Sequence, residues 1–313
     1  MTSPSHVRND GRMVGVLLVI LATAGWSTAG VWVKLVVENS GISSIDLAFW
    51  RDFVMFLLLL AGLLLLKREW LHIHRRDLPW LILMGAIGIG VFHVLWNLSV
   101  LMNGAAIATV LQYNAPVLVA LAARLLWQEG LTWQKILAIA LALSGTLLIA
   151  LPSASGVQIS PVGLSVGLAS AAAISVFSLV GKRLTGSYSP WTVMTYVFGF
   201  GALILLPVAL LTGDSWTLTP LVTAAFAGFI FFPTLGGFGL YTMGLQRLPA
   251  SVAAIIATTE VPLAAVVAYL VLGERLDGVQ WAGMLLVMTG VALISMPRAW
   301  LRAPRAAIRS ALR

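Results

Sequence analysis

The sequence predicts an all-α membrane protein with ten transmembrane helices, arranged as two inverted five-helix repeats with the N and C termini in the cytoplasm. Three observations support this prediction. The 313-residue chain is 60% hydrophobic and only 10% charged, whereas soluble domains carry about 25% charged residues. The apolar residues fall in blocks of about 18–25, the length that crosses a bilayer as a helix. Lysine and arginine gather between alternate blocks, as the positive-inside rule describes.

Ten apolar blocks are long enough to be spans. The first follows two arginines, but it is too long for a signal peptide and lacks a cleavage site, so we expect it to stay in the mature protein. The eighth has the weakest register, because Pro233 and three glycines interrupt it. In chain order the expected helices are Val14–Val37, Ile45–Leu66, Pro79–Met102, Ala105–Trp127, Trp133–Leu151, Val162–Leu184, Pro190–Leu211, Leu221–Leu245, Ser251–Leu272 and Val279–Met296.

Lysine and arginine lie mainly on one side of the expected membrane. With the N-terminus inside, only Lys34, Arg51 and Arg275 fall toward the outer side. The positive-inside rule then places both termini in the cytoplasm, and the net charge of +8 needs no nucleic acid to explain it. The cytoplasmic side collects Arg8, Arg12, Lys67, Arg68, Arg75, Arg76, Arg124, Lys135, Lys182, Arg183, Arg247, Arg298, Arg302, Arg305, Arg309 and Arg313.

These assignments divide the chain into four parts. They are a cytoplasmic N-terminal segment (1–13), a first repeat (14–152), a second repeat (162–297) and a basic cytoplasmic tail (298–313). In the tail, arginine recurs every three or four residues. This spacing suits a short amphipathic helix on an anionic inner leaflet, and it equally suits a basic tail that serves only as a topology signal.

The second half of the chain repeats the first. The stretch Asn114–Pro152 matches Glu260–Pro297 with equal spacing except for one residue, and Lys34 has a weaker counterpart in Lys182. Each half holds five spans, an odd number, so the second half must enter the membrane upside down. Inverted repeats are typical of secondary transporters, which bind substrate near the midplane between the repeats. The matching pairs are Pro116 and Pro262, Glu129 and Glu274, Gly145 and Gly290, and Pro152 and Pro297.

This pattern resembles the drug/metabolite transporter superfamily, specifically its ten-helix exporters with two EamA repeats. The residues that carry the resemblance are Pro116, Glu129-Gly130, Gly145, Glu260-Val261-Pro262, Gly273-Glu274 and Gly290. The resemblance covers about residues 14–296, with one departure: Asn114 stands where the second repeat has Glu260. It implies export of amino acids, including aromatic ones, or of other small metabolites across the bacterial inner membrane. Relatives in the superfamily move quaternary ammonium compounds or nucleotide-sugars.

Two prolines predict helix kinks at mid-depth. Pro116 and Pro262 free the backbone carbonyls of Gln112 and Thr258, because proline has no N–H to donate. Free polar backbone is tolerated in a membrane only where protein, water or ligand satisfies it. The kinks therefore indicate either a cavity or helix packing in which neighbouring side chains repair the backbone. Their equivalent positions in the two halves favour the cavity.

Glu260 is the most informative residue of the sequence, since it is a carboxylate inside an apolar run. A charge at the centre of a membrane helix costs about 2.5–3.5 kcal/mol on insertion scales. One interpretation is a neutral, buried acid that forms a hydrogen bond across a helix interface. The other is a cavity residue that attracts an ammonium group, exchanges a proton, or does both.

Other residues at mid-depth are candidates for the same cavity. His93 and Asn97 lie four residues apart and should share one helix face. Packing is the alternative role for each, above all for His93 as a neutral core residue and for Ser175, which continues a stripe of small residues. The candidate substrate-binding residues are Glu260, His93, Asn97, Trp96, Tyr113, Asn114, Trp26, Ser27 and Ser175.

Arg51 and Asp52 begin the second expected helix, close to the outer surface. Because they are adjacent, their side chains should point in different directions, so we do not pair them. We expect Arg51 to extend toward the membrane interface; a role in gating the outer entrance is the alternative.

Several classes of protein lack support in the sequence. The chain has no cysteine, no Walker A loop, no GxSxG elbow and no HExxH motif. We therefore expect no enzyme, cofactor or metal site, and transport driven by a gradient of substrate or protons. The expected partners are a small molecule (an amino acid or related metabolite) and membrane lipids, with no nucleic acid, in a monomer or weak homodimer. The alternatives are export of organic cations or drugs and, outside transport, an intramembrane enzyme or receptor.

Overall fold

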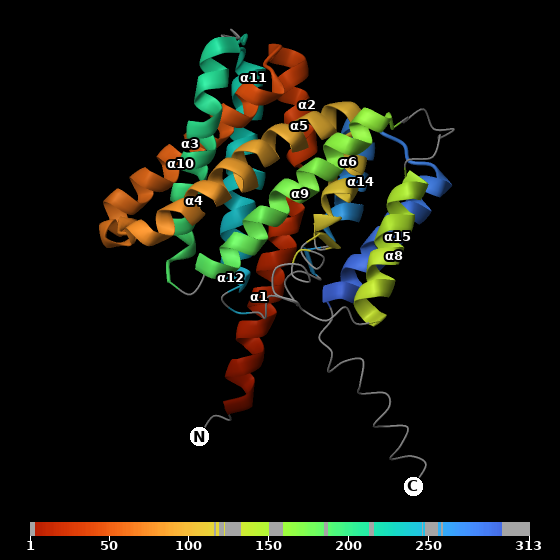
Figure 1. Ribbon diagram of the computed structural model, residues 1–313, viewed down its shortest axis with the longest axis horizontal. Helices are drawn as coiled ribbons and strands as arrows, with labels where there is room; N and C mark the ends of the chain where they lie inside the picture. The colour runs from red at the N-terminus through yellow and green to blue at the C-terminus, as the bar shows by residue number, and fades with distance from the viewer. Residues whose placement is uncertain are drawn as a thin grey trace.

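The computed structural model of the chain describes residues 4–115, 117–118, 122, 133–149, 159–184, 187–212, 216–245, 247, 256–257 and 259–295. The regular elements of this part of the chain are all helical (Figure 1). In the first half they are α1 (Pro4–Ser27), α2 (Ala29–Ser40), α3 (Ser44–Leu66), η1 (Arg68–Leu71), η2 (Arg75–Asp77), α4 (Leu78–Gly85), η3 (Ala86–Val91), α5 (Phe92–Asn103), α6 (Ala105–Gln112) and α8 (Trp133–Ile149). In the second half they are α9 (Pro161–Leu184), α10 (Pro190–Thr212), α11 (Pro220–Phe229), η4 (Ile230–Gly237), α12 (Phe238–Leu245), α14 (Glu260–Leu272) and α15 (Gly278–Ser295).

Six helical segments of the described residues are long and apolar enough to cross a membrane. They are Met13–Ser40, Ser44–Leu66, Arg75–Asn103, Pro161–Gly181, Pro190–Thr212 and Pro220–Tyr241. Their bounds lie within a few residues of the first three and the sixth to eighth expected helices. Two shorter apolar segments, Ile136–Leu148 and Glu260–Leu272, fall within the fifth and ninth. The count of ten and the orientation of the termini stay predictions.

Parts of the sequence prediction fall outside the described residues. They include most of the fourth expected helix after residue 118, the beginning of the ninth, and the basic tail. Pro116 and Glu129 are also outside the described residues, so the first predicted kink stays a prediction.

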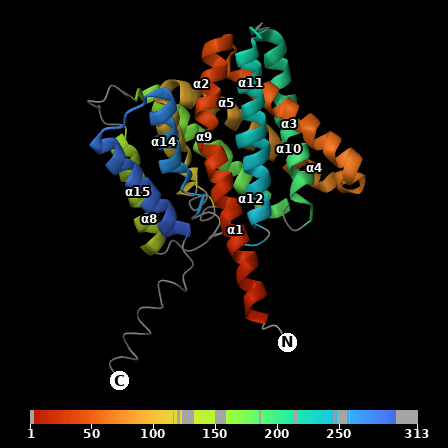
Figure 2. The same ribbon diagram turned by 180° about the vertical axis from the view of Figure 1, so that it is seen from behind.

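Helices from the two halves pack against one another in matching pairs. α3 packs along α10, α8 along α15, and α6 against α14. Figures 1 and 2 both show α8 and α15 side by side at one edge of the molecule, with α3, α4 and α10 at the other. Helices in lipid associate through close packing rather than the hydrophobic effect. Gly145 and Gly290 provide this packing between α8 and α15, since a Cβ on either would lie 2.5–2.6 Å from a backbone oxygen of the facing helix.

The two largest of four buried clusters among the described residues fill much of the space between the helices. The larger joins α2, α5, α6, α11 and α14, with Val33, Trp96, Ile107, Phe229 and Val261 among its members. The second joins α3, α4, α9 and α10. The polar side chains of the candidate site lie between and beside these clusters. Their hydrogen bonds must therefore come from other protein groups or from a ligand.

The first span bends where α1 ends and α2 begins. The hydroxyl groups of Ser27 and Thr28 donate to carbonyls three residues earlier, Ala24 and Gly25, at 2.8 and 2.7 Å. Such bonds from serine and threonine loosen a helix locally. Thr28 also accepts from the indole N–H of Trp32 at 3.0 Å, which fixes the start of α2.

Wide π-helical turns interrupt the third and the eighth expected spans, at η3 and η4. In η4 the cause is local. Pro233 has no N–H for the carbonyl of Phe229, four residues earlier, and the hydroxyl of Thr234 donates to that carbonyl instead, at 2.9 Å. Because π turns are rare and recur at functional sites, both η3 and η4 are candidates for a part of the functional site.

Candidate functional site

Glu260 is the first residue of α14. Just before it, at Thr259, the chain forms a turn. Pro262 lies in the first turn of α14, where the missing N–H would have had no partner within the helix. The predicted kink at Pro262 therefore takes the form of a helix start. α6 ends in a similar way, at Gln112, with a turn at Tyr113 and Asn114. Both breaks precede the repeat-related prolines.

Glu260 is only 5% exposed, and its side chain faces Tyr113. The Tyr113 hydroxyl lies 2.9 Å from Glu260 Oε2 and 2.6 Å from the backbone oxygen of Ala257. A phenol has one proton, so it satisfies one of these acceptors at a time. Among the described residues, none is in an ion pair with Glu260. A buried carboxylate without a cation is the kind of group that binds a cationic ligand or a proton.

α1 packs beside the residues around Glu260. The hydroxyl groups of Thr23 and Thr259 lie 3.2 Å apart. Trp26 packs against Phe238 and Tyr241, with ring centroids 5.4 and 5.0 Å away. The indole N–H of Trp26 is buried without a hydrogen-bond partner in the described part of the chain. A buried donor of this kind lacks the partner that buried polar groups normally have.

Three predicted residues are already satisfied by the protein. Asn114 donates to the Leu111 carbonyl at 3.1 Å and accepts from Thr146 at 3.1 Å. Ser27 donates to a carbonyl of its own helix. The Ser175 hydroxyl lies 2.7 Å from the Ala171 carbonyl oxygen and 3.2 Å from that of Ala115, and it donates its one proton to either. These contacts fit a role in helix packing, which is the alternative that the sequence left open for these residues.

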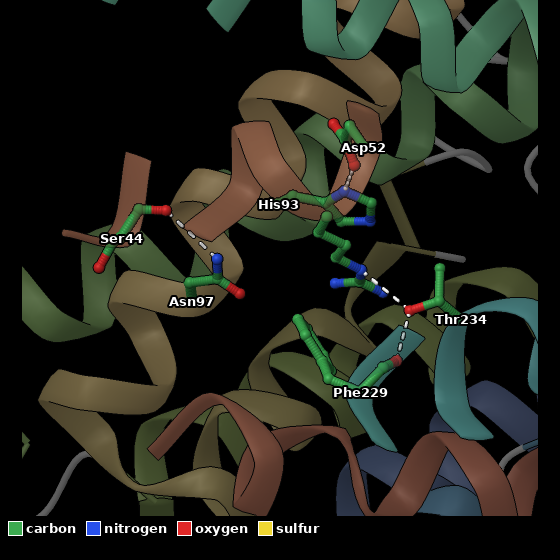
Figure 3. A network of polar contacts seen from close by, with 7 residues as sticks. Ser44, Asp52, His93, Asn97, Phe229 and Thr234 are labelled. Carbon is green, nitrogen blue, oxygen red and sulfur yellow. Dashed lines mark hydrogen bonds and ion pairs between the residues drawn. The ribbon is translucent and has the colours of Figure 1, made fainter. Parts of the chain in front are cut away.

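His93 and Asn97 belong to a second group of polar residues, between α3 and α5 (Figure 3). His93 Nδ1 lies 2.5 Å from Asp52 Oδ1, and both side chains are fully buried. Asn97 donates to the Ser44 carbonyl at 3.3 Å. The two α5 residues thus face the same helix, as their spacing predicted. Trp96 turns into the larger buried cluster, and its indole N–H has no partner among the described residues.

Arg51 corrects an expectation. It does not extend toward the membrane interface, because its side chain is buried, with the residue only 5% exposed. Its Nε donates to Thr234 Oγ1 at 3.2 Å, and the guanidinium carbon lies 4.5 Å from the centre of the Phe229 ring. The expectation that Arg51 and Asp52 do not pair agrees with the geometry, since Asp52 faces His93 instead.

From the sequence, Asp52 was expected at a helix start but not in the candidate site, and Thr234 was not singled out. Both have a local signal: Asp52 is a charge within an apolar run, and Thr234 follows a proline inside a helix. Neither signal identifies a partner. The structure therefore divides several of the predicted residues into two groups. The Glu260 group consists of Tyr113, Glu260 and Trp26. The α3–α5 group contains His93 and Asn97, and Arg51, Asp52 and Thr234 belong to it as well. No set of three or more His, Asp or Glu side chains among the described residues is arranged to hold a metal ion.

The fold and these buried charges define a multi-pass helical membrane protein, and comparison with known proteins gives its family. The EamA-like transporter family matches the chain twice, over residues 13–151 and 161–296. The chain belongs to the EamA-like transporter family. The two matches cover nearly the whole chain, one in each half.

Individual relatives agree with this assignment. The chain is 30% identical over 295 residues to the uncharacterised inner membrane transporter YicL of Salmonella typhimurium, covering 90% of this chain and 95% of that protein. It is 27% identical over 281 residues to a probable terminal-alkyne amino-acid exporter of Streptantibioticus cattleyicolor, covering 90% and 93%. A crystal structure with 18% identity superposes with a TM-score of 0.65, covering 93% of this chain and 98% of that chain. At that identity it shows a shared fold.

Proposed function

We propose that this chain is a secondary transporter that exports small metabolites, and amino acids in the first place, by alternating access. The observation that carries the proposal is the buried carboxylate of Glu260. It lies at the break before α14, and no described residue pairs with it as a cation. A charge at this depth requires a partner, and the ammonium group of a substrate or a proton would provide one.

The surroundings of Glu260 suit a small amphipathic molecule. Tyr113 brings aromatic surface to the carboxylate. Trp26 of α1, the helix that packs against α14, contacts Tyr241 and adds an N–H donor without a partner among the described residues. The amino-acid exporter among the relatives supports the same class of substrate. An organic cation would also satisfy Glu260, so export of organic cations is the second candidate. The two differ in whether the substrate must carry a carboxylate.

The proposed cycle uses the breaks in the two repeats. α6 and the segment before α14 are interrupted at equivalent places, next to Tyr113 and Glu260. In transporters with inverted repeats, discontinuous helices form the substrate site while one repeat rocks against the other. We expect His93, Asn97, Trp96, Asn114, Ser27 and Ser175 to line or support the path that substrate takes past these breaks.

Flux of radiolabelled amino acids in proteoliposomes tests the proposal. Wild type is compared with Glu260→Gln and with Glu38→Gln, which removes an exposed carboxylate of α2. Aromatic and small neutral amino acids are measured separately, with and without an imposed pH gradient. We expect Glu260→Gln to lower flux about tenfold or more, since hydrogen bonds to charged groups contribute about 1.5–3 kcal/mol, and Glu38→Gln to match wild type.

Each outcome has a defined meaning. Dependence of wild-type flux on the pH gradient would indicate proton exchange, and independence would indicate ammonium recognition alone. Equal flux for wild type and Glu260→Gln at every pH would remove Glu260 from the site. Absence of amino-acid flux in wild type, with flux of quaternary ammonium compounds, would favour the second candidate.

A further inference from the structure

Arg51 is a buried cation inside the membrane span formed by α3. It is the eighth residue of that helix, about 10 Å from its start at a rise of 1.5 Å per residue. Its guanidinium has one hydrogen bond to a described residue, from Nε to Thr234 Oγ1. The two terminal nitrogens have no hydrogen bond to any described residue, although they are the groups with which arginine binds carboxylates in pairs.

Asp52 does not neutralise this cation by direct contact. One of its oxygens, Oδ1, is held by His93 at 2.5 Å. The other, Oδ2, lies at the α10 backbone, where it is the nearest atom to a Cβ built on Gly201, at 2.8 Å, and it has no hydrogen-bond partner among the described residues. The adjacent carboxylate is therefore oriented by α5 and α10, and the fork of Arg51 stays open.

Thr234 determines which part of Arg51 stays open. Its hydroxyl donates to the Phe229 carbonyl, so its oxygen is free to accept from Arg51 Nε. Figure 3 draws the dashed lines that reach Thr234 in this contact and in its hydrogen bond to Phe229, with His93 and Asn97 in the same view. With Nε bound and the Phe229 ring against the guanidinium carbon, the planar group is fixed in orientation while its two terminal nitrogens remain for a ligand. Prepositioned donors of this kind favour bidentate recognition.

The neighbouring polar atoms are also without partners. Asn97 Oδ1 and His93 Nε2 are fully covered and make no hydrogen bond with any described residue. Unlike Asn97 Oδ1 and His93 Nε2, the terminal nitrogens of Arg51 keep some solvent-accessible surface. Unpartnered buried polar groups call for a missing water, ion or ligand. Asn97 Oδ1 is an acceptor and would take a donor, whereas the terminal nitrogens of Arg51 are charged donors and would take an anion.

The geometry points to Arg51 as the residue that binds the carboxylate of the transported substrate, on the α3 surface that faces η4. This inference rests on the proposed function and narrows it, because it makes the substrate class carboxylate-bearing molecules such as amino acids rather than simple organic cations. Thr234 positions the guanidinium.

The test compares a substrate with and without its carboxylate. Flux of phenylalanine and of phenylalaninamide is measured in proteoliposomes for wild type, Arg51→Gln, Arg51→Lys and Arg75→Gln, the last being an exposed arginine as control. We expect Arg51→Gln to raise the KM for phenylalanine about tenfold or more, as loss of a charge-assisted pair predicts, with phenylalaninamide unchanged. Arg51→Lys keeps the charge but not the fork, and should raise the KM less. Arg75→Gln should match wild type for both molecules.

Stability measurements keep the result clear of misfolding. The same two molecules are added to purified protein, because a ligand that binds only the folded state raises Tm. Phenylalanine should raise the Tm of wild type but not that of Arg51→Gln. If Arg51→Gln does not fold, the ratio of the two KM values in Arg51→Lys decides instead, and an unchanged ratio overturns the inference.

The two proposals fail separately. Equal transport of phenylalanine and phenylalaninamide by wild type and by both Arg51 variants would leave the transporter in place and overturn the carboxylate site. Absence of transport of both molecules by wild type would overturn export of amino acids. In that case the Tm shift with phenylalanine, present in wild type and absent in Arg51→Gln, would still support binding at Arg51, and equal shifts would overturn it.

Discussion

Lys34 and Glu274 form an ion pair that joins the two halves of the chain. Lys34 Nζ donates to Glu274 Oε1 at 2.6 Å, and the two side chains are only 19% and 12% exposed. The same oxygen accepts from the backbone N–H of Ala105, at 3.2 Å, where α6 begins. One carboxylate thus holds α2, α6 and the end of α14 together. This contact therefore stabilises the packing of the two halves seen in the structure.

Charge reversal tests the role of this ion pair. Lys34→Glu and Glu274→Lys should each place two like charges together, and each should destabilise the protein by about 1.5–3 kcal/mol through the lost charge-assisted bond. The double variant restores opposite charges. We expect it to recover most of the lost Tm, although the N–H of Ala105 then faces a lysine. Recovery of neither Tm nor flux by the double variant would contradict a direct pair.

Tyr113→Phe removes the donor that faces Glu260. Glu260 Oε2 and the Ala257 carbonyl then lose the one hydroxyl proton that they share, and a buried unsatisfied acceptor costs about 1–3 kcal/mol. We expect a lower Tm in detergent and a smaller loss of flux than in Glu260→Gln, because the carboxylate itself remains. Tyr269→Phe is the matched control, since Tyr269 is 52% exposed. Equal stability of the two variants would show that the Tyr113 hydroxyl contributes nothing.

The Asp52–His93 contact should appear as a coupling energy. Removing one partner of a buried pair costs about 3–5 kcal/mol, so Asp52→Ala and His93→Ala should each strongly lower the free energy of unfolding. The double variant should cost less than the two losses added together, by about 0.5–3 kcal/mol. Unfolding by denaturant in detergent measures all four corners of the cycle. Glu38→Gln combined with Asp52→Ala provides the additive control, because Glu38 is exposed on α2.

The spans were predictable because hydropathy is a local property. The run Ser44–Leu66 differs by one residue from the expected Ile45–Leu66, and Pro190–Thr212 by one from Pro190–Leu211. The bend at Thr28, between α1 and α2, was not predicted. It comes from hydrogen bonds of Ser27 and Thr28 to carbonyls of their own helix, and these bonds leave the apolar composition of the span unchanged. The wide turn in η4 had a visible cause in Pro233, but its geometry depends on the Thr234 hydroxyl.

Partners between helices were the part that sequence could not provide. Glu260 was identified as a costly carboxylate, yet the tyrosine that faces it lies 147 residues away. The depth of Arg51 in α3 depends on where that helix begins and on what packs against it. Neither can be read from one sequence, so Arg51 was expected at the interface. Its burial follows from contact with η4, 183 residues along the chain. One sequence has no information on such pairs beyond the cost of leaving each charge alone.

The glycine contact between α8 and α15 gives a prediction about assembly of the fold. A Cβ on Gly145 would lie 2.5 Å from the Gly283 carbonyl oxygen, and one on Gly290 would lie 2.6 Å from the Ala138 carbonyl oxygen. The obstructing atoms are backbone, so the helices must separate to accommodate a side chain. We expect Gly145→Ala and Gly290→Ala each to lower the free energy of unfolding by about 1–3 kcal/mol, the usual cost of overpacking.

Gly62 is the control for this prediction. It lies inside α3, and a Cβ added to it would have no atom within 4 Å, so Gly62→Ala should raise stability by about 0.5–1 kcal/mol through its better helix propensity. Opposite signs at Gly62 and at the α8–α15 glycines would separate close packing from propensity. A gain in stability for Gly145→Ala would instead show that α8 and α15 can move apart at no cost, and their contact would then not be part of what holds the two halves together.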